Sequence, residues 1–363
     1  MLSSLLRRWG AAGFTVFACL AVRQWYWFSV NCDPLALVQR EIGRWAGSVW
    51  RLQPYELGEG VIFLKTHKTA SSSVTSVIWH NLCETGRRNC FLPPSLKPGK
   101  TWDFRLSRDW RLMRRRGGSS LLGNGSFPYN VWLYHATYST FLFSVVPQTR
   151  RMISIVRRPG RRFESAWHWY NHSSHLQTDL TEFAIRAMNR SNSYAGAFKY
   201  RSGLDATTEE LTGIVDFRNR LFLQRSAYED VLRRVARREL ILLVAERFDE
   251  SLLVLGHLLG WSVDQLVSFK HKVGAYRRVD EAVCRLLDQL QPFDLGLWRL
   301  ANAALNKFIA DNFVKSDFDR QLDELQKRNA VIHEACHKDA RSKPECSMML
   351  DNNEIVKARW GHN

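Results

Sequence analysis

Residues 60–78 have the sequence Gly-Val-Ile-Phe-Leu-Lys-Thr-His-Lys-Thr-Ala-Ser-Ser-Ser-Val-Thr-Ser-Val-Ile. The short apolar run after the glycine predicts a buried strand that ends near Lys65. The serines are favourable helix caps, and the apolar residues after them recur at helical spacing. Backbone N–H groups at the start of such a helix point at an anion, and the helix dipole favours negative charge there. This segment therefore predicts a strand, a tight loop and a helix that together bind a phosphate group.

Lysines and hydroxyl groups are concentrated in the loop. Lys65 and Lys68 lie on either side of His67, directly after the apolar run. A serine-capped helix with solvated lysines would need no ligand, but two ammonium groups at a helix start favour a phosphate site. The GxxxxGK[ST] pattern is missing, which argues against a Walker A loop and a nucleoside kinase. The candidate phosphate-binding residues are Lys65, Thr66, Lys68, Thr69, Ala70, Ser71 and Ser72.

A second basic motif follows an apolar strand predicted at 151–156. Arg157 stands at the end of this strand, Pro159 suits the first turn of the next helix, and Ser165 lies further along it. Arg157 and Ser165 can converge on a second phosphate. Two phosphate sites on neighbouring strand ends suit a nucleotide with phosphates at both its 5′ and 3′ positions. The other arginines of this motif are expected to lie in solvent: Arg161 and Arg162.

The remaining sequence alternates strands and helices, which predicts an α/β fold with a mainly parallel sheet flanked by helices. The expected elements are strands at 131–135, 151–156 and 240–245 and helices at 159–170, 249–259 and 280–336. Residues 86–128, rich in Pro, Gly and Arg, are expected to form an irregular region that contributes to an acceptor face. With 45% hydrophobic and 24% charged residues, the chain is neither mostly disordered nor a multi-span membrane protein.

The amino end carries a targeting signal. An uncharged apolar run begins at Trp9 behind two arginines and can be extended through an aromatic cluster to Val30. This pattern favours a type II signal anchor, with a cleaved signal peptide as the alternative. Either one sends the rest of the chain into the secretory lumen. Asn-X-Ser triplets at Asn124, Asn171 and Asn189 agree with that compartment.

The cysteines also suit an oxidising compartment. Outside the apolar segment they are Cys32, Cys83, Cys90, Cys284, Cys336 and Cys346. Their short separations favour disulfides between Cys83 and Cys90 and between Cys336 and Cys346, although Cys83 could also be a buried free thiol on a helix. The chain has no CxxC pair with matching metal ligands, so a structural zinc site is not expected.

Residues 63–74 resemble the 5′-phosphosulfate loop of the Golgi galactose-3-O-sulfotransferase family, and residues 156–165 resemble its 3′-phosphate motif. The similarity continues through 129–135, 242–252 and 267–269, and it covers most of residues 60–312. It implies a P-loop-like sulfotransferase fold. It also implies transfer of a sulfuryl group from 3′-phosphoadenosine 5′-phosphosulfate (PAPS) to a galactose 3-hydroxyl of a glycolipid or glycoprotein glycan. Such a transfer needs no metal, because lysine and helix-terminal amides can supply the positive potential.

The resemblance also implies roles for the candidate residues. Lys68 would steady the bridging oxygen and the 5′-phosphate, with Lys65 as a second cation, while Arg157 and Ser165 would hold the 3′-phosphate. Ala70 stands where many sulfotransferases have glycine, which can adopt the turn more freely. The phosphate-binding residues that follow the reactive lysine would be Thr69, Ala70, Ser71 and Ser72.

Two histidines are candidates for the base that accepts the hydroxyl proton. His135 is expected at a strand end, and its surroundings resemble the segment with the catalytic histidine in uronosyl 2-O-sulfotransferases. His67 is the rival, because it lies beside Lys68 in the loop. A histidine at a strand end can also serve only as a hydrogen-bonded core residue.

The expected organisation is a cytoplasmic tail and signal anchor at 1–30, a stem at 31–58, a sulfotransferase domain at 59–340 and a tail at 341–363. The catalytic domain would face the Golgi lumen. One alternative is a glycosaminoglycan uronosyl 2-O-sulfotransferase, because the net charge of +17 suits a polyanionic acceptor. Another is a non-catalytic glycan-binding relative. Nucleic acid is not an expected partner, and the oligomeric state is left open.

Overall fold

The computed structural model describes residues 33–56, 58–84, 90, 129–189, 203–214, 221–268 and 278–336. The expected signal anchor at 1–30, most of the irregular region at 86–128 and the tail at 341–363 lie outside these residues. The expected pairing of Cys336 with Cys346 also lies outside them, since Cys346 is not described. Within the described ranges, no helix is long and apolar enough to cross a membrane.

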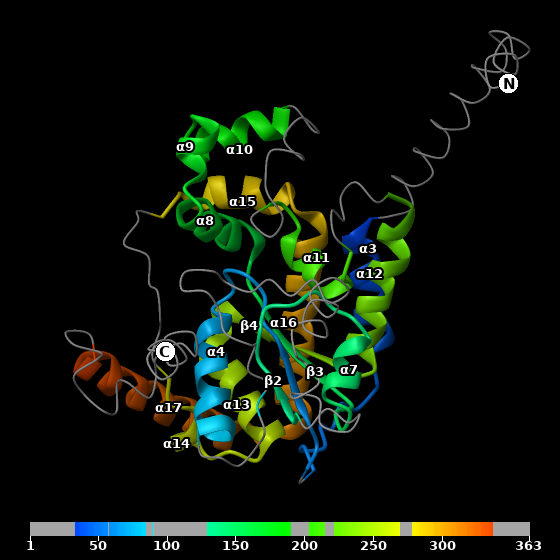
Figure 1. The fold of residues 1–363 in the computed structure, drawn as a ribbon, viewed down its shortest axis with the longest axis vertical. Coiled ribbons are helices and arrows are strands. Elements are labelled where there is room, and N and C mark those ends of the chain that lie inside the picture. Colours follow the sequence, from blue (N-terminus) through cyan, green and yellow to red (C-terminus); the bar gives the residue numbers. More distant parts are fainter. Residues whose placement is uncertain are drawn as a thin grey trace, which may run out of the picture.

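Four parallel strands form the centre of the fold, in the order β2-β1-β3-β4 (Figure 1). They are β1 (Val61–Leu64), β2 (Val131–Trp132), β3 (Met152–Val156) and β4 (Leu240–Val244). Every residue of these strands is buried, as expected for a parallel sheet covered on both faces. The expected α/β fold with a parallel sheet is therefore confirmed.

The strand order places the ends of β1 and β3 side by side. The chain passes from β1 to β2 on one side and then returns to β3 on the other side of β1. Leu64, the last residue of β1, pairs with Ser154 two residues before the end of β3. The loops after these two strands therefore diverge at one edge of the sheet, which is where parallel α/β sheets bind their ligands.

Helices on either side bury the sheet. The helix α4 (Ser71–Ile78) follows β1 and continues as a π-helical segment, Trp79–Glu84. On β4 pack α12 (Leu221–Ala236), α13 (Phe248–Leu259) and α16 (Pro292–Asn312). The shorter α7 (Phe141–Val145) follows β2 in the chain and precedes β3. The helices α14 (Val263–Leu266) and α17 (Lys315–Cys336) pack on α13.

A smaller helical layer stands beyond the sheet, at the upper end of the molecule in Figure 1. It contains α8 (Pro159–Trp169), α9 (His172–Leu176), α10 (Leu180–Asn189) and α15 (Glu281–Gln289). Its own apolar cluster is centred on Phe163, Trp167 and Phe183. Because α8 follows β3 directly, this layer is joined to the edge of the sheet where β1 and β3 end.

The segment expected as a stem belongs to the packed domain from Pro34 onward. Residues Pro34–Arg44 form the helix α3, which packs on α16 and buries Leu37 and Val38. The Trp50 amide donates to Asp311 Oδ2 at 2.6 Å, and the indole packs on Phe308. The described part of the expected stem, 31–58, therefore packs on the domain through buried Leu37, Val38 and Trp50, while Val49 is exposed, and the domain bounds stay a prediction.

The cysteines differ in part from the expected pairing. Cys83 and Cys90 form a disulfide with a Cα–Cα distance of 5.7 Å, which confirms the short-range pair. Cys90 also forms an isolated parallel bridge with Val131 in β2. Cys284, in contrast, is a buried free thiol on α15. Burial, assisted by the nearby Asp288 carboxylate, raises the pKa of the Cys284 thiol to about 11.

Gly160 allows α8 to approach α15 closely. A Cβ at this position would meet the carbonyl oxygen of Cys284 and lie 2.8 Å from its Sγ. We therefore expect Gly160→Ala to lower the free energy of unfolding by about 1–3 kcal/mol through overpacking. Gly43→Ala is the matched control, because nothing lies within 4 Å of a Cβ there and alanine favours the helix. Denaturant unfolding of both variants measures the difference, and equal stabilities would contradict the close approach.

Candidate functional site

The candidate site lies where the loops after β1 and β3 diverge. The loop between β1 and α4 contains two non-glycine residues in the left-handed conformation, Lys68 and Ala70, each with φ of 64°. Ala70 is the N-cap of α4, and its side chain makes no capping hydrogen bond. Turns with left-handed residues make concave sites from successive backbone N–H groups, and these sites bind anions. The loop therefore has a backbone suited to phosphate, with alanine in a conformation that glycine adopts more readily.

Three hydroxyl groups hold the shape of this loop. Thr66 Oγ1 donates to the Ile155 carbonyl at 2.5 Å and lies 2.8 Å from Thr69 Oγ1. Ser71 Oγ donates to the Thr66 carbonyl at 2.5 Å. These three side chains are buried, whereas Ser72 is half-buried. The Thr66 hydroxyl thus ties the loop to β3, the other two hydroxyls bond within the loop, and Ser72 has the greater access to a ligand.

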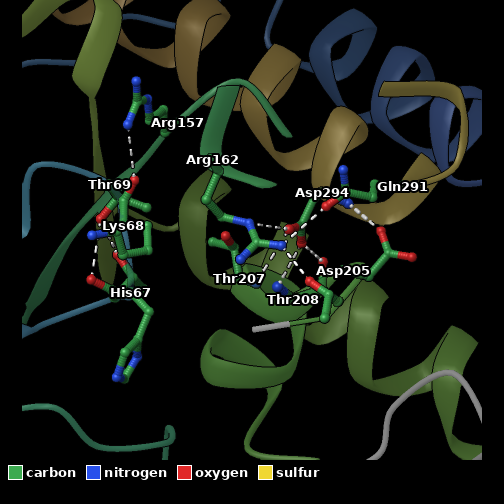
Figure 2. Close-up of polar contacts among 12 residues, drawn as sticks. His67, Lys68, Thr69, Arg157, Arg162, Asp205, Thr207, Thr208, Gln291 and Asp294 are labelled. Atoms are coloured by element: carbon green, nitrogen blue, oxygen red, sulfur yellow. Dashed lines mark hydrogen bonds and ion pairs between the residues drawn. The ribbon is translucent and has the colours of Figure 1, made fainter. Parts of the chain in front are cut away.

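Arg157 joins the two expected phosphate motifs. Its Nη1 donates to the Lys68 carbonyl at 3.3 Å (Figure 2), and its Nε lies 4.0 Å from Glu246 Oε1. The Lys68 ammonium lies 4.0 Å from the centre of the Trp169 ring at the end of α8. Ser165 is one helical turn before Trp169, so both side chains occupy the same face of α8. The structure therefore brings Lys68 and Arg157 together and places Ser165 on the helix face that approaches Lys68.

The two candidate bases are adjacent. The His67 and His135 rings stack with centroids 3.8 Å apart and planes 24° from parallel. His135 Nδ1 lies 2.7 Å from the carbonyl oxygen of Lys65. Lys65 is a buried residue with 2% exposure. A carbonyl oxygen can only accept, so the proton of a neutral His135 ring is on Nδ1 and its lone pair is on Nε2. His135 therefore has the tautomer that a base acting through Nε2 requires.

Sequence reasoning missed Glu210, which binds His67 from the helix α11 (Ala206–Thr212). The His67 backbone N–H donates to Glu210 Oε2 at 3.0 Å, and the ring Nδ1 bonds to Oε1. The Glu210 side chain is 1% exposed. Its sequence context, Thr-Thr-Glu-Glu, has the polar composition of a solvent-facing turn and offers no signal of this contact.

Arg162 was expected in solvent, and this expectation is wrong. The side chain is fully buried beneath α8, where Nη2 donates to Gln291 Oε1 at 3.0 Å and Nε lies 3.5 Å from Asp294 Oδ2 (Figure 2). Arg161 is only partly exposed and pairs with Glu164 and Glu281, at 3.1 Å each. Glu164 lies on α8 itself, whereas Glu281 belongs to α15, Asp294 belongs to α16 and Gln291 is the N-cap of α16, so both arginines also join α8 to its neighbouring helices.

His67, His135 and Glu210 raise the question of a metal site, because their potential ligand atoms lie within 4.8 Å of one another. A shared ion requires the in-plane lone pairs of both imidazole rings to converge on one point. Rings that stack at 3.8 Å and 24° direct these lone pairs side by side instead. The arrangement fits proton transfer between acid and base groups better than it fits metal coordination.

Comparisons with known proteins identify the family of the chain. A family model described as Galactose-3-O-sulfotransferase matches residues 3–353, which confirms the expected family resemblance. Galactose-3-O-sulfotransferase 2 from Sus scrofa is 27% identical over 210 residues, which are 58% of this chain and half the length of that relative. Galactosylceramide sulfotransferase from Homo sapiens is 24% identical over 329 residues, covering 85% of this chain and 70% of that protein. The similarity therefore extends across the sheet, both motifs and the carboxyl-terminal helices.

Proposed function

Since the chain belongs to the galactose-3-O-sulfotransferase family and is a carbohydrate sulfotransferase, we propose that it transfers a sulfuryl group from PAPS to the 3-hydroxyl of galactose. The acceptor is a galactose-terminated glycolipid or glycoprotein glycan. The observation that carries this proposal is the hydrogen bond from Arg157 to the Lys68 carbonyl. It joins the two phosphate motifs at the strand ends where a nucleotide with 5′ and 3′ phosphates needs them.

The donor is held at both phosphates by residues of this chain. Backbone N–H groups at the start of α4, the Ser72 hydroxyl and the Lys68 ammonium receive the 5′-phosphosulfate. Lys65, buried at the end of β1, adds a second positive charge to the field of the loop. Arg157 and Ser165 bind the 3′-phosphate. The buried hydroxyls of Thr66 and Thr69 fix the loop in the shape that these contacts require.

The transfer is an in-line displacement at sulfur. The galactose 3-oxygen forms a bond to sulfur, the bond from sulfur to the 5′-phosphate oxygen breaks, and the hydroxyl proton passes to a histidine. Lys68 stabilises the charge that develops on the leaving phosphate oxygen, so the chain itself supplies the positive potential without a metal ion. Proximity of both substrates at one sheet edge supplies the rest of the acceleration.

Trp169 is the candidate platform for the acceptor sugar. Its ring is 57% exposed and lies beside the Lys68 ammonium, next to the position of the transferred group. We expect Trp169→Ala to raise the KM for the galactoside about two- to tenfold, because stacking on an aromatic face contributes about 0.5–1.5 kcal/mol. Trp169→Phe retains a ring and serves as the control. Initial rates at varied acceptor and varied PAPS measure the effect, and an increase confined to the KM for PAPS would assign the ring to the donor.

We place the protein in the Golgi membrane as a single-pass type II protein, anchored by residues 1–30, with its catalytic domain in the lumen. The disulfide between Cys83 and Cys90 supports an oxidising compartment. Protease protection of the full-length chain in sealed Golgi vesicles tests the orientation. Digestion of the catalytic domain without detergent would contradict it.

The acceptor class is tested with the full-length protein in detergent and PAPS carrying labelled sulfate. The panel contains galactosylceramide, lactosyl glycans, galactose-terminated N-glycans and desulfated glycosaminoglycans. Label on the galactosides supports the proposed function. Label only on the uronic-acid polymers would favour the alternative suggested by the +17 charge. Binding of PAPS without transfer to any acceptor would favour a non-catalytic glycan-binding relative.

A further inference from the structure

The two stacked histidines have partners of different chemistry. His67 bonds through Nδ1 to the Glu210 carboxylate, while His135 bonds through Nδ1 to the Lys65 carbonyl. A carboxylate stabilises an imidazolium, whereas a carbonyl oxygen orients a neutral ring without adding a countercharge. The same pair of side chains therefore lies in two different electrostatic environments 3.8 Å apart.

The burial of Glu210 strengthens the effect of its charge on the two histidines. A carboxylate with 1% exposure is costly to desolvate, and a positive partner in hydrogen-bond contact offsets much of that cost. Protonated His67 supplies this charge through the ring contact, and the His67 backbone N–H adds a second bond at 3.0 Å. Once His67 is cationic, a second proton on the stacked His135 ring is disfavoured, because like charges at this distance repel.

We propose that Glu210 is a positioning residue that assigns the two histidines their roles: it holds His67 as the cation and so keeps His135 neutral as the base. This inference rests on the proposed function and extends it. The cationic His67 adds positive charge beside Lys68, where the leaving phosphate develops negative charge. His135 accepts the hydroxyl proton on Nε2 while Nδ1 keeps its proton on the Lys65 carbonyl.

Glu210 is held by contacts to both histidine segments. Its backbone carbonyl accepts the Tyr138 N–H at 2.7 Å, three residues after His135, while its side chain binds His67. The other end of α11 is fixed to α16, because the Thr208 N–H and Oγ1 both donate to Asp294 Oδ1 at 2.7 Å (Figure 2). Arg162 pairs with the same Asp294. The buried arginine thus supports the helix that presents Glu210.

Other charged groups around the pair oppose protonation of both rings, which is why the carboxylate decides between them. Lys65 and Lys68 belong to the same loop as His67, and Arg157 contacts that loop from the end of β3. Tyr170, the C-cap of α8, lies within range of the Glu210 charge: burial raises the pKa of the Tyr170 phenol, the Glu210 charge raises it further and Arg162 lowers it. Glu210 therefore supplies the local negative charge that stabilises a proton on His67.

The first test is an NMR titration of the full-length protein in detergent, with labelled histidine rings assigned through His67→Gln and His135→Gln. We expect the His67 ring to stay protonated to a higher pH than the His135 ring. In Glu210→Gln, which keeps the side-chain shape and removes the charge, the order should invert or collapse. Equal titration of the two rings, or an unchanged order in Glu210→Gln, would overturn the proposal. Because this readout needs no turnover, it is independent of the proposed function.

The kinetic test follows the acid limb of kcat/KM. In Glu210→Gln we expect the apparent pKa of this acid limb to rise by about one unit, because His135 then gains its proton more readily. Glu324→Gln is the control, since it removes the same charge from a side chain that is 40% exposed on α17 and should leave the limb in place. His67→Gln should give a similar shift, and the double variant should shift no further. An acid limb that stays in place in Glu210→Gln while affinity for the product nucleotide is unchanged would contradict the positioning role.

Discussion

Lys68→Ala is expected to lower kcat at least a hundredfold, the largest loss of any single substitution in the loop. Removing one preorganised positive group that stabilises a developing oxyanion costs about 10²–10³ in rate. The left-handed backbone at Lys68 and the hydrogen bond from Arg157 to its carbonyl hold this residue between the two motifs. Transfer of labelled sulfate at saturating PAPS and acceptor measures the effect.

Two variants make this prediction specific to the Lys68 ammonium. Lys68→Arg retains the charge and should recover part of the rate. Lys327→Ala removes a lysine whose side chain is 75% exposed on α17, and it should leave kcat unchanged. A kcat for Lys68→Ala within a factor of a few of the unaltered enzyme would contradict the assignment of the loop.

His135→Ala is expected to lower kcat about 10²–10⁴-fold while affinity for the product nucleotide is retained. General base catalysis contributes rate accelerations of that order, and the Lys65 carbonyl holds the His135 ring through Nδ1, which leaves Nε2 as the basic atom. Single-turnover rates and nucleotide binding by calorimetry separate the chemical step from donor affinity.

The comparison with His67 decides between the two candidate bases. Added imidazole should restore part of the activity of His135→Ala, because a small base can occupy the space of the lost ring. His175→Ala, at an exposed position on α9, is the control and should be fully active. If His67→Ala were inactive and His135→Ala retained the rate of the unaltered enzyme, His67 would be the base.

The strands and the phosphate loop could be predicted because their signals are local. Each strand is a mostly apolar run, interrupted only by Ser154 in β3, as expected where both faces of a parallel sheet are covered. The expected helix start at Ser71 agrees with α4 because the apolar spacing after it is a local signal, but the N-cap is Ala70 and not one of the serines. The contact of Lys68 with Arg157 follows from the rule that parallel strands end at one edge, although the strand order itself has no local signal.

The groups that surround the site could not be predicted, because their positions depend on distant segments. Glu210 is separated by 143 residues from His67, and its burial depends on the packing of α11 against α16. Arg162 is an arginine at an apparently exposed helix start, and its burial depends on distant segments, including α16 and the Gly203 carbonyl. The helix α3 looked like a polar stem because half of its residues face solvent, while Leu37 and Val38 reach the core.

The most direct test of the proposed activity compares two acceptors that differ at one position. The full-length protein is incubated with labelled PAPS and either methyl β-galactoside or its 3-O-methyl derivative. We expect sulfated galactoside and an equal amount of released 3′-phosphoadenosine 5′-phosphate from the first, and no labelled product from the second. Equal labelling of both acceptors would show that another hydroxyl is used and would contradict galactose 3-O-sulfation.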